Sequence, residues 1–435
     1  MSPAEVAKPT VGRLEPVVEG LSFPTSLAFD DDGALYTAEA GLPFGGAEPG
    51  GRVWRHTACG ARSLLASALR PPVNGLTFHD GALYVSEGGH PARISRLSLD
   101  GRLTPVLEGL PGPGNYHTNM TAFGPDGRMY FSQGAMTNSG IVGLDAYDLG
   151  WLRQLPHAHD LPGYEVELVG VNATTRDPLA TNSNSTVTTG AFVPFGQPTD
   201  SGQRIAAQMP CTAAILRCED DGRNLELIAW GLRNAFGLGF DTDGRLLAID
   251  QGADDRGSRP IGNAPDLLYE IREHSWYGWP DFIGGTPVTD PRFRPARGPA
   301  PGFLLSNHNE LPPPQNALLE FPPHVAAVKF DSQPDGRLLA AMFGDERPMT
   351  APHGPRRGRG VALVDTTTAT IEPIAAEGFT RPIDIRFGPD GAAYVVDFGR
   401  FEMDATDGVV ATARSGSVWR LVLEDTTDAV ERSAS

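Results

Sequence analysis

Ionisable and amide side chains gather at a few places in this chain, in patterns that could perform chemistry on a small molecule. His117 precedes Asn119 by two residues, and Arg233 and Asn234 are adjacent at the start of an apolar run. The segment 251–255 reads QGADD. Histidine is the side chain that accepts a proton near neutral pH. His117 is therefore the best candidate for a general base.

Two arginines and the acidic segment point to charged ligands. A planar guanidinium pairs with a carboxylate through two parallel hydrogen bonds, which favours Arg233 and Arg381 as binders of anionic oxygens. Calcium takes oxygen ligands in irregular geometry, so backbone carbonyls and carboxylates suit it. The metal ligands predicted on this basis are Gly252, Ala253, Asp254 and Asp255. A solvated acidic turn is the alternative interpretation of the same segment.

A short pattern recurs six times and indicates which elements must position these side chains. Each copy has an apolar piece ending in Phe, a turn ending in Asp-Gly and a second strand, as in "GLGFDTDGRLLAIDQG". Asp-Gly favours a tight turn, so each copy reads as a β-hairpin. Strand signals between the copies, such as "GRVWRH" and "GVALVD", raise the number to roughly four strands per repeat. Such a repeat is typical of a β-propeller blade.

The predicted fold class is all-β: a six-bladed β-propeller with four-stranded antiparallel blades. Two long loop insertions are expected at about 144–210 and 280–314, and unrelated hairpins in a sandwich are the alternative. We expect an N-terminal tail over 1–12, a single propeller domain over 13–424 and a C-terminal tail over 425–435. The strand at 416–423 has no hairpin after it, so "RLEPVVEGL" near the N-terminus is expected to join its sheet and close the ring.

A propeller would bring the candidate residues to one mouth of its channel. The first strand of each blade lines the channel, and its start faces the same mouth as the loop after the second strand. The strand starts supply His117, Asn119, Arg233, Asn234, His324 and Arg381. The loops supply Glu39, Glu87, Gln133, Gln251, Asp254, Asp255 and Asp397. Charged groups that converge in a concavity predict a small-molecule site.

Composition narrows the class of ligand. The net charge of -18 disfavours a nucleic-acid partner, and no apolar run reaches the roughly 18 residues that a membrane helix needs. The N-terminus lacks the pattern of an export signal, which predicts a cytoplasmic location for the chain as given, or a periplasmic or secreted one if a leader has been removed. Cys59, Cys211 and Cys218 are too few for a disulfide framework; a Cys211–Cys218 bridge and two unlinked thiols both stay open.

Three motifs resemble the glucose/sorbosone dehydrogenase family: "WGLRNAFGLGFDTDGRLLAIDQGADDRGSRP", "YGWPDF" and "YHTNMTAFGPDGRMYFSQG". The resemblance runs from about residue 21 to 423, and "HVAAVKF" and "FGDERP" are similar to a sorbosone-dehydrogenase-like branch. It implies a six-bladed propeller that uses pyrroloquinoline quinone (PQQ) with calcium. It also implies that His117 takes the hydroxyl proton of a sugar while hydride passes to the quinone. Arg233 and Asn234 would contact the cofactor, and 251–253 both cofactor and calcium.

The predicted function is therefore a PQQ- and calcium-dependent oxidoreductase that acts on an aldose or a related hydroxyl or aldehyde substrate. The catalytic residues would be His117 and Arg233, and the cofactor contacts Arg233, Asn234, Gln251, Arg381, Asn119 and His324. Two departures from the soluble glucose dehydrogenases of the family are Tyr116, in place of an acid, and Ala253, in place of proline.

Two other functions stay open on the sequence. The first is a metal-dependent hydrolase, such as a lactonase, or a lyase, in which Glu39, Asp397 and His324 hold the ion and His117 shuttles a proton. The second is a non-catalytic propeller that binds a partner at its mouth, although interface centres are usually aromatic and apolar rather than charged.

Overall fold

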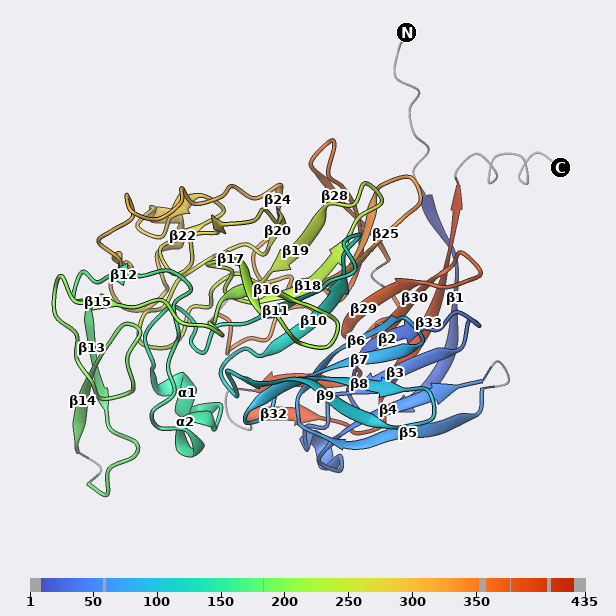
Figure 1. Cartoon of the computed structure of the whole chain (residues 1–435), viewed down its shortest axis with the longest axis horizontal. Helices are drawn as coiled ribbons and strands as arrows, with labels where there is room; N and C mark the ends of the chain where they lie inside the picture. Colours follow the sequence, from blue (N-terminus) through green and yellow to red (C-terminus); the bar gives the residue numbers. More distant parts are fainter. Residues whose placement is uncertain are drawn as a thin grey trace, which may run out of the picture.

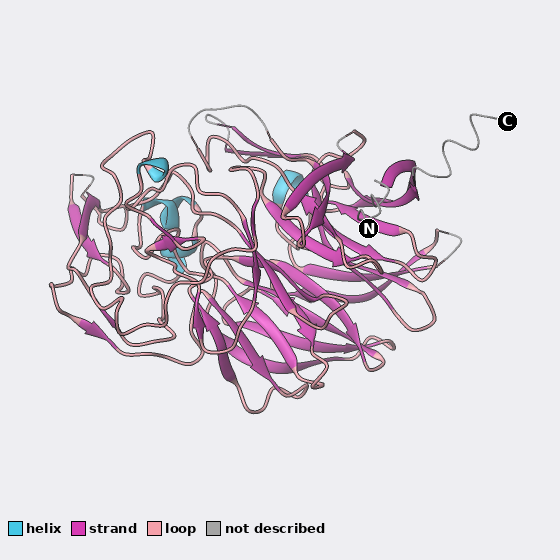
Figure 2. Ribbon diagram, turned by 90° about the horizontal axis from the view of Figure 1, so that it is seen from above, coloured by secondary structure: helices cyan, strands magenta, loops and turns pink. Residues whose placement is uncertain are grey.

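The computed structural model describes residues 9–57, 60–182, 184–351, 357–375, 377–404 and 408–425. Its strands form six sheets around a central channel, and the first strands of neighbouring sheets contact one another (Figures 1 and 2). The six-bladed β-propeller predicted from the repeat is confirmed. Each blade contains four antiparallel strands, and the third blade carries one further short parallel strand.

The blades follow the chain, each running outward from the channel. Blade one has β2 (Pro24–Phe29), β3 (Leu35–Glu39), β4 (Gly51–His56) and β5 (Arg62–Leu69). Blade two has β6 (Val73–His79), β7 (Ala82–Glu87), β8 (Ala92–Ser98) and β9 (Leu103–Leu110). Blade three has β10 (Thr118–Phe123), β11 (Met129–Gln133), β16 (Ala214–Cys218), β17 (Glu226–Trp230) and the added β21 (Ser275–Trp276).

The remaining blades have the same plan. Blade four has β18 (Ala235–Phe240), β19 (Leu246–Asp250), β20 (Leu267–Glu270) and β24 (Leu319–Glu320). Blade five has β25 (Ala327–Ser332), β26 (Leu338–Met342), β27 (Gly360–Asp365) and β28 (Thr370–Ala375). Blade six has β29 (Pro382–Phe387), β30 (Ala393–Asp397), β33 (Gly416–Asp425) and β1 (Pro9–Leu21).

Blade six closes the ring by combining the two ends of the chain. β1 pairs antiparallel with β33, with Leu14 opposite Leu421, so the predicted closure is confirmed. The pairing starts at Pro9, within the segment that the sequence assigned to the N-terminal tail. The two outer strands of blade six therefore come from opposite ends of the chain.

Asp-Gly turns shape the inner hairpins as the repeat predicts. In blade four the Asp241 carboxylate accepts the backbone N–H groups of Asp243 and Arg245, and Gly244 has a φ of 79° that favours glycine. The phenylalanines on which the six copies align line one cavity of about 440 Å³ at the far mouth of the channel: Phe29, Phe78, Phe123, Phe240, Phe330 and Phe387. Their shared position confirms the predicted register of the repeat.

The two long insertions form one lobe beside the propeller (Figure 1, left). The first contains α1 (Leu144–Asp148), α2 (Trp151–Gln154), β12 (Val166–Glu167), β13 (Asn172–Arg176), β14 (Thr186–Gly190) and β15 (Arg204–Ile205). The second contains β22 (Phe282–Ile283), β23 (Thr286–Pro287) and a 3-10 turn at Pro291–Phe293. A β-bridge between Leu168 and Leu305 joins them. Blade one adds a 3-10 turn at Phe44–Gly46, and blade six a hairpin of β31 (Phe401–Asp404) and β32 (Gly408–Ala411).

The structure answers two questions that the sequence raised, on the state of the cysteines and on membrane-spanning helices. Cys211 and Cys218 are both buried free thiols, so the unlinked alternative holds, and Cys59 lies outside the described residues. In the described part of the chain, the helices are all too short or too polar to cross a membrane.

Candidate functional site

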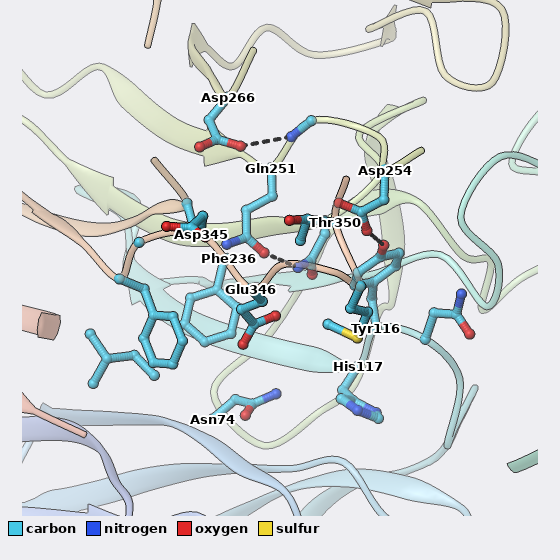
Figure 3. Close-up of a pocket in the computed structure, with 18 of the residues that line it drawn as sticks. Asn74, Tyr116, His117, Phe236, Gln251, Asp254, Asp266, Asp345, Glu346 and Thr350 are labelled. Atoms are coloured by element: carbon cyan, nitrogen blue, oxygen red, sulfur yellow. Dashed lines mark hydrogen bonds between the residues drawn. The ribbon is translucent and has the colours of Figure 1, made fainter. Parts of the chain in front are cut away.

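The channel mouth opposite the six aligned phenylalanines opens into a cavity of about 290 Å³ (Figure 3). Nine of the predicted site residues line it: His117, Asn119, Arg233, Asn234, Gln251, Gly252, Ala253, Asp254 and His324. Arg381 and Asp255 do not line it. The propeller therefore brings most of the predicted residues together, as the register of the repeat requires.

The acidic residues that end the second strands have a structural task instead of facing the cavity. Each carboxylate accepts backbone N–H groups at the start of its own blade, which would otherwise be buried without a partner. The pairs are Glu39 with Ser22 (2.7 Å), Glu87 with Arg70 (2.7 Å), Asp250 with Asn234 (2.6 Å) and Asp397 with Arg381 (2.9 Å). Gln133 similarly accepts the Thr118 hydroxyl. The expectation that these loops add free charges to the mouth is wrong for Glu39, Glu87, Gln133 and Asp397, which lie outside the cavity lining.

All the N–H groups of the Arg233 guanidinium donate to acceptors within the protein. Its Nε donates to the Asn138 carbonyl at 3.1 Å, and Nη1 to the carbonyls of Gln251 (3.2 Å) and Gly252. Nη2 donates to the Tyr116 hydroxyl, the Asn138 side-chain oxygen (2.7 Å) and the Asp254 carboxylate (2.7 Å). A guanidinium has five N–H groups, and each has an acceptor here. Arg233 is buried, so these bonds offset the cost of removing its charge from water.

Asp254 is held by the same network. Its carboxylate pairs with Arg233 at 2.7 Å and with Arg256 at 3.0 Å. Tyr116, the departure noted in the sequence, contributes a hydroxyl that contacts both arginines and lies 3.3 Å from the Asp254 carboxylate. On this side of the cavity wall, Arg233, Arg256 and Asp254 are therefore paired with one another.

The predicted calcium ligands are not arranged around a common point. The Gly252 carbonyl is occupied by Arg233, and Asp254 by two arginines. The Asp255 carboxylate accepts the backbone N–H of Ala296 at 2.7 Å, away from the cavity. Among the described residues, no cluster of three or more His, Cys, Asp or Glu side chains could hold a metal ion. Packing explains why position 252 is a glycine, because a Cβ atom there would clash with the Pro265 carbonyl oxygen.

A chain of amides crosses the base of the cavity. Asn74 donates to Asn119 (3.2 Å), Asn119 to Asn234 (2.9 Å) and Asn234 to Gln251 (2.7 Å), so blades two, three and four are linked. Lys329 is fully buried in the channel near this base. Its Nζ donates to the carbonyls of Thr25 and Asn74 and lies 3.6 Å from the Asp384 carboxylate.

The two cavity histidines are neutral at physiological pH. Burial lowers the pKa of His117 to about 4 and also lowers the pKa of His324. His117 Nδ1 is buried and has no hydrogen-bond partner in the described part of the chain. A neutral imidazole can accept a proton, which is the state that a general base requires.

Arg381 occupies a position in blade six like that of Arg233 in blade four, but it points away from the cavity. Its guanidinium donates to the carbonyls of Phe401 (2.9 Å), Gly344 (3.1 Å) and Asp345 (2.8 Å), and to the Glu402 carboxylate (3.0 Å). Its exposed fraction is 0%. Arg381 therefore fixes the turn after β26 and is not available to a cofactor, contrary to the prediction.

Glu346 is a cavity residue that the sequence analysis did not single out. It follows β26, and its side chain extends into the cavity with those of Asn74 and His117 (Figure 3). Burial raises the pKa of Glu346 to about 7. The repeat contained a signal for it: "FGDERP" is in the same register as "DQGADD", after the second strand of the next copy.

The fold and the cavity define a six-bladed propeller with a pocket of mixed polar and apolar lining at one mouth. No protein-family model and no curated protein matches the chain. Solved structures do match. The PQQ-bound aldose sugar dehydrogenase of Streptomyces coelicolor has 18% identity and a TM-score of 0.56, covering 97% of this chain and 100% of that chain.

Two further structures match over similar lengths. An oxidoreductase (glucose dehydrogenase) of Thermus thermophilus has 20% identity and a TM-score of 0.52, covering 94% of this chain and 99% of that one. The soluble aldose sugar dehydrogenase of Escherichia coli in its apo form has 12% identity, with the same TM-score and coverage. The predicted resemblance to sugar dehydrogenase propellers is thus confirmed for the fold.

Proposed function

We propose that this protein is an oxidoreductase of the sugar type, which oxidises a hydroxyl or hydrated aldehyde of a small polyhydroxylated substrate in the cavity. The observation that carries the proposal is His117: a neutral imidazole in the cavity wall that makes no hydrogen bond to the described residues. The amide chain of Asn74, Asn119, Asn234 and Gln251 supports it, because amides donate to and accept from sugar hydroxyls.

The reaction requires a proton acceptor and a hydride acceptor. Oxidation of a carbinol removes a proton from its oxygen and a hydride from its carbon. His117 accepts the proton, and burial keeps the imidazole unprotonated beforehand. The hydride passes to a two-electron acceptor bound in the same cavity.

The residues present do not fit PQQ bridged by calcium. PQQ carries three carboxylates, which call for free cations, whereas Arg233, Arg256 and Lys329 are bonded to protein groups. The Gly252 carbonyl, expected to bind calcium, accepts from Arg233. Carboxylates of Asp266, Asp345 and Glu346 also face the cavity and would repel a tricarboxylate. We therefore derive no step through this cofactor.

One experiment tests the proposal and the acceptor together. The purified protein is given a panel of aldoses and an artificial redox dye, without additives, with calcium alone, and with calcium and PQQ. Dye reduction that is lost in His117→Gln supports the proposal. Reduction that needs PQQ and calcium would show that the Arg233 network opens to admit them. No reduction of the dye with any sugar under any condition overturns the proposal.

Hydrolysis of a sugar lactone is a second candidate, favoured by Glu346. A carboxyl group whose pKa is about 7 can donate a proton to a leaving oxygen, while neutral His117 activates water. The metal version of this alternative loses support, because Glu39 and Asp397 are bonded to backbone N–H groups. Acid release from a lactone panel in a pH-stat distinguishes hydrolysis from oxidation.

A further inference from the structure

The carboxylates of the cavity differ in how completely protein groups pair with them. Its arginines are committed: Arg233 has acceptors for all five N–H groups, and Arg256 pairs with Asp254 and contacts the Tyr116 hydroxyl. Lys329 lies buried in the channel with two carbonyls and Asp384. A ligand entering the cavity therefore meets cations that are already neutralised.

Two adjacent carboxylates that line the same cavity, Asp345 and Glu346, are less completely paired. Glu346 lines the cavity, and in the described part of the chain its carboxylate has no hydrogen-bond donor. Asp345 is 1% exposed, and its Oδ2 atom is buried without a hydrogen bond, the Arg347 guanidinium being 3.7 Å away. A buried carboxylate oxygen that lacks a donor is costly in free energy. A ligand that supplies a donor here would gain that free energy.

The turn that carries both carboxylates is rigidly held. Arg381 donates to the carbonyls of Gly344 and Asp345, and the Arg357 backbone N–H donates to Asp345 Oδ1 at 3.1 Å. The Glu346 carbonyl accepts from the backbone N–H of Met349 at 2.9 Å. Because the backbone is fixed on both sides, little entropy is lost when a ligand binds the carboxylates.

Phenylalanine rings form the adjoining part of the wall. Phe343 is next but one to Asp345 in the chain, and its ring centroid lies 5.4 Å from that of Phe398 and 6.3 Å from that of Phe401. Phe44 and Phe236 line the cavity with them. The faces of aromatic rings attract cations, most strongly where water is excluded. Arg381 already lies 4.9 Å from the centroid of Phe343, and Lys329 lies 5.3 Å from that of Phe236, so Phe44, Phe398 and Phe401 are the rings left for a ligand. Carboxylates beside these rings suit an organic ammonium group better than a neutral hydroxyl.

We propose that Glu346 and Asp345 bind the ammonium group of the ligand, so that the substrate is an amino sugar or a similar amino polyol. The ammonium group would donate to the two carboxylates while a hydroxyl of the same molecule reaches the amide chain and His117. The assignment of a substrate rests on the proposed function, whereas binding of the amine does not.

The electrostatic surroundings of Glu346 support this ligand. Burial is the largest cause of the raised pKa of Glu346; Asp254 and Asp345 raise it further, and Arg381 and Arg256 only partly oppose them. His324 and His117 are kept neutral by burial and add no positive charge. A bound cation lowers the cost of ionising Glu346, so amine binding should release a proton near pH 7 and strengthen as the pH rises through 7.

Isothermal titration calorimetry with three sugars of similar shape tests the site. D-Glucosamine, D-glucose and D-glucuronate differ mainly in charge. At about pH 7 we expect glucosamine to bind at least about tenfold more tightly than glucose, the size of one charge-assisted hydrogen bond, and glucuronate more weakly than glucose. Glu346→Gln should remove most of the preference for glucosamine and leave glucose affinity within about twofold.

A second variant at the site and a control variant far from it test the assignment. Asp345→Asn keeps the acceptor for Arg357 and should also reduce the preference, with an unchanged melting temperature. Asp243→Asn removes one charge from an exposed turn at the opposite mouth and should change nothing. Equal affinity for glucosamine and glucose, no binding of glucosamine, or an unchanged preference in Glu346→Gln overturns the site. Tight binding of glucosamine without dye reduction by any sugar overturns the proposed function instead and leaves the site intact.

Discussion

The two sides of the cavity differ in how their charges are satisfied. On the side of blades three and four, Arg233, Arg256, Asp254 and Tyr116 neutralise one another through short hydrogen bonds. On the other side, after β26 of blade five, Glu346 accepts no hydrogen bond from the described residues and Asp345 keeps a buried carboxylate oxygen without one. Charged groups with complete partners stabilise the wall, whereas groups without them are available to a ligand. Residue type alone does not distinguish the two sides.

The largest effect is expected from His117, which starts blade three but lies outside the network of paired charges. His117→Gln should lower the turnover of dye-linked sugar oxidation about 10²–10⁴-fold, because glutamine cannot accept the hydroxyl proton. The melting temperature should stay the same, since the ring makes no hydrogen bond to the described residues that is lost. His79→Gln removes a histidine from the far mouth and is the matched control. Equal activity in the two variants would contradict the assignment of the base.

Substitution of Arg233 should mainly lower the stability of the protein, whereas substitution of His117 should mainly lower its turnover. Arg233→Met leaves Asp254, Asn138 and the carbonyls of Gln251 and Gly252 buried without a donor, which should cost about 3–5 kcal/mol in the free energy of unfolding. Urea denaturation measures it. Arg245→Met, which breaks a more exposed pair with Asp241, should cost less than about 1 kcal/mol. If the two variants are equally stable, the paired side does not hold the wall.

Glu346 should make stability depend on pH. Its pKa is about 7 in the folded protein, against an ordinary value of 4.5 in an unfolded chain, so the folded state binds more protons between these values. Stability contributed by this group is therefore lost as the pH rises from about 4.5 to 7. At about pH 8, Glu346→Gln should be more stable than the wild type by up to about 2 kcal/mol, and at about pH 4 the two should be alike. A difference that is the same at both pH values would contradict the burial of a free carboxylate.

The smallest effect is expected at Asp255, which follows Asp254 in sequence but lies outside the cavity. Asp255→Asn keeps an acceptor for the Ala296 backbone N–H and should leave turnover within about twofold. Asp254→Asn, which weakens the pairs with Arg233 and Arg256, should destabilise the protein by about 1–3 kcal/mol. Thermal unfolding and dye reduction on both variants check the contrast, and equal effects would remove it.

Much of the fold could be predicted because the repeat is local. The Asp-Gly turns and the phenylalanine of each copy set the hairpin register, and the register placed His117, Arg233 and His324 at one mouth. The direction in which each side chain points could not be predicted in the same way. Arg233 and Arg381 start equivalent strands, yet Arg381 is drawn toward the carbonyls of the turn after β26 and leaves the cavity.

The loop after the second strand shows the same limit. Glu39 and Asp397 were expected at the mouth because they follow second strands, but the first backbone N–H groups of each blade need acceptors and these carboxylates supply them. Glu346 lies four residues beyond the end of its second strand, whereas Glu39 and Asp397 are the last residues of theirs. It extends into the cavity because Asp345 and Arg381 already secure the backbone around it.

Turn residues and the alternation of apolar side chains are enough to specify the six blades, the closure of the ring by both ends of the chain, and the mouth at which polar residues gather. The contacts between blades decide instead which charged groups are paired within the protein and which are left for a ligand. Arg233 meets Tyr116 and Asn138 from the preceding blade, and no pattern within one repeat encodes that meeting. The chemistry left to this cavity is what remains after those pairs have formed.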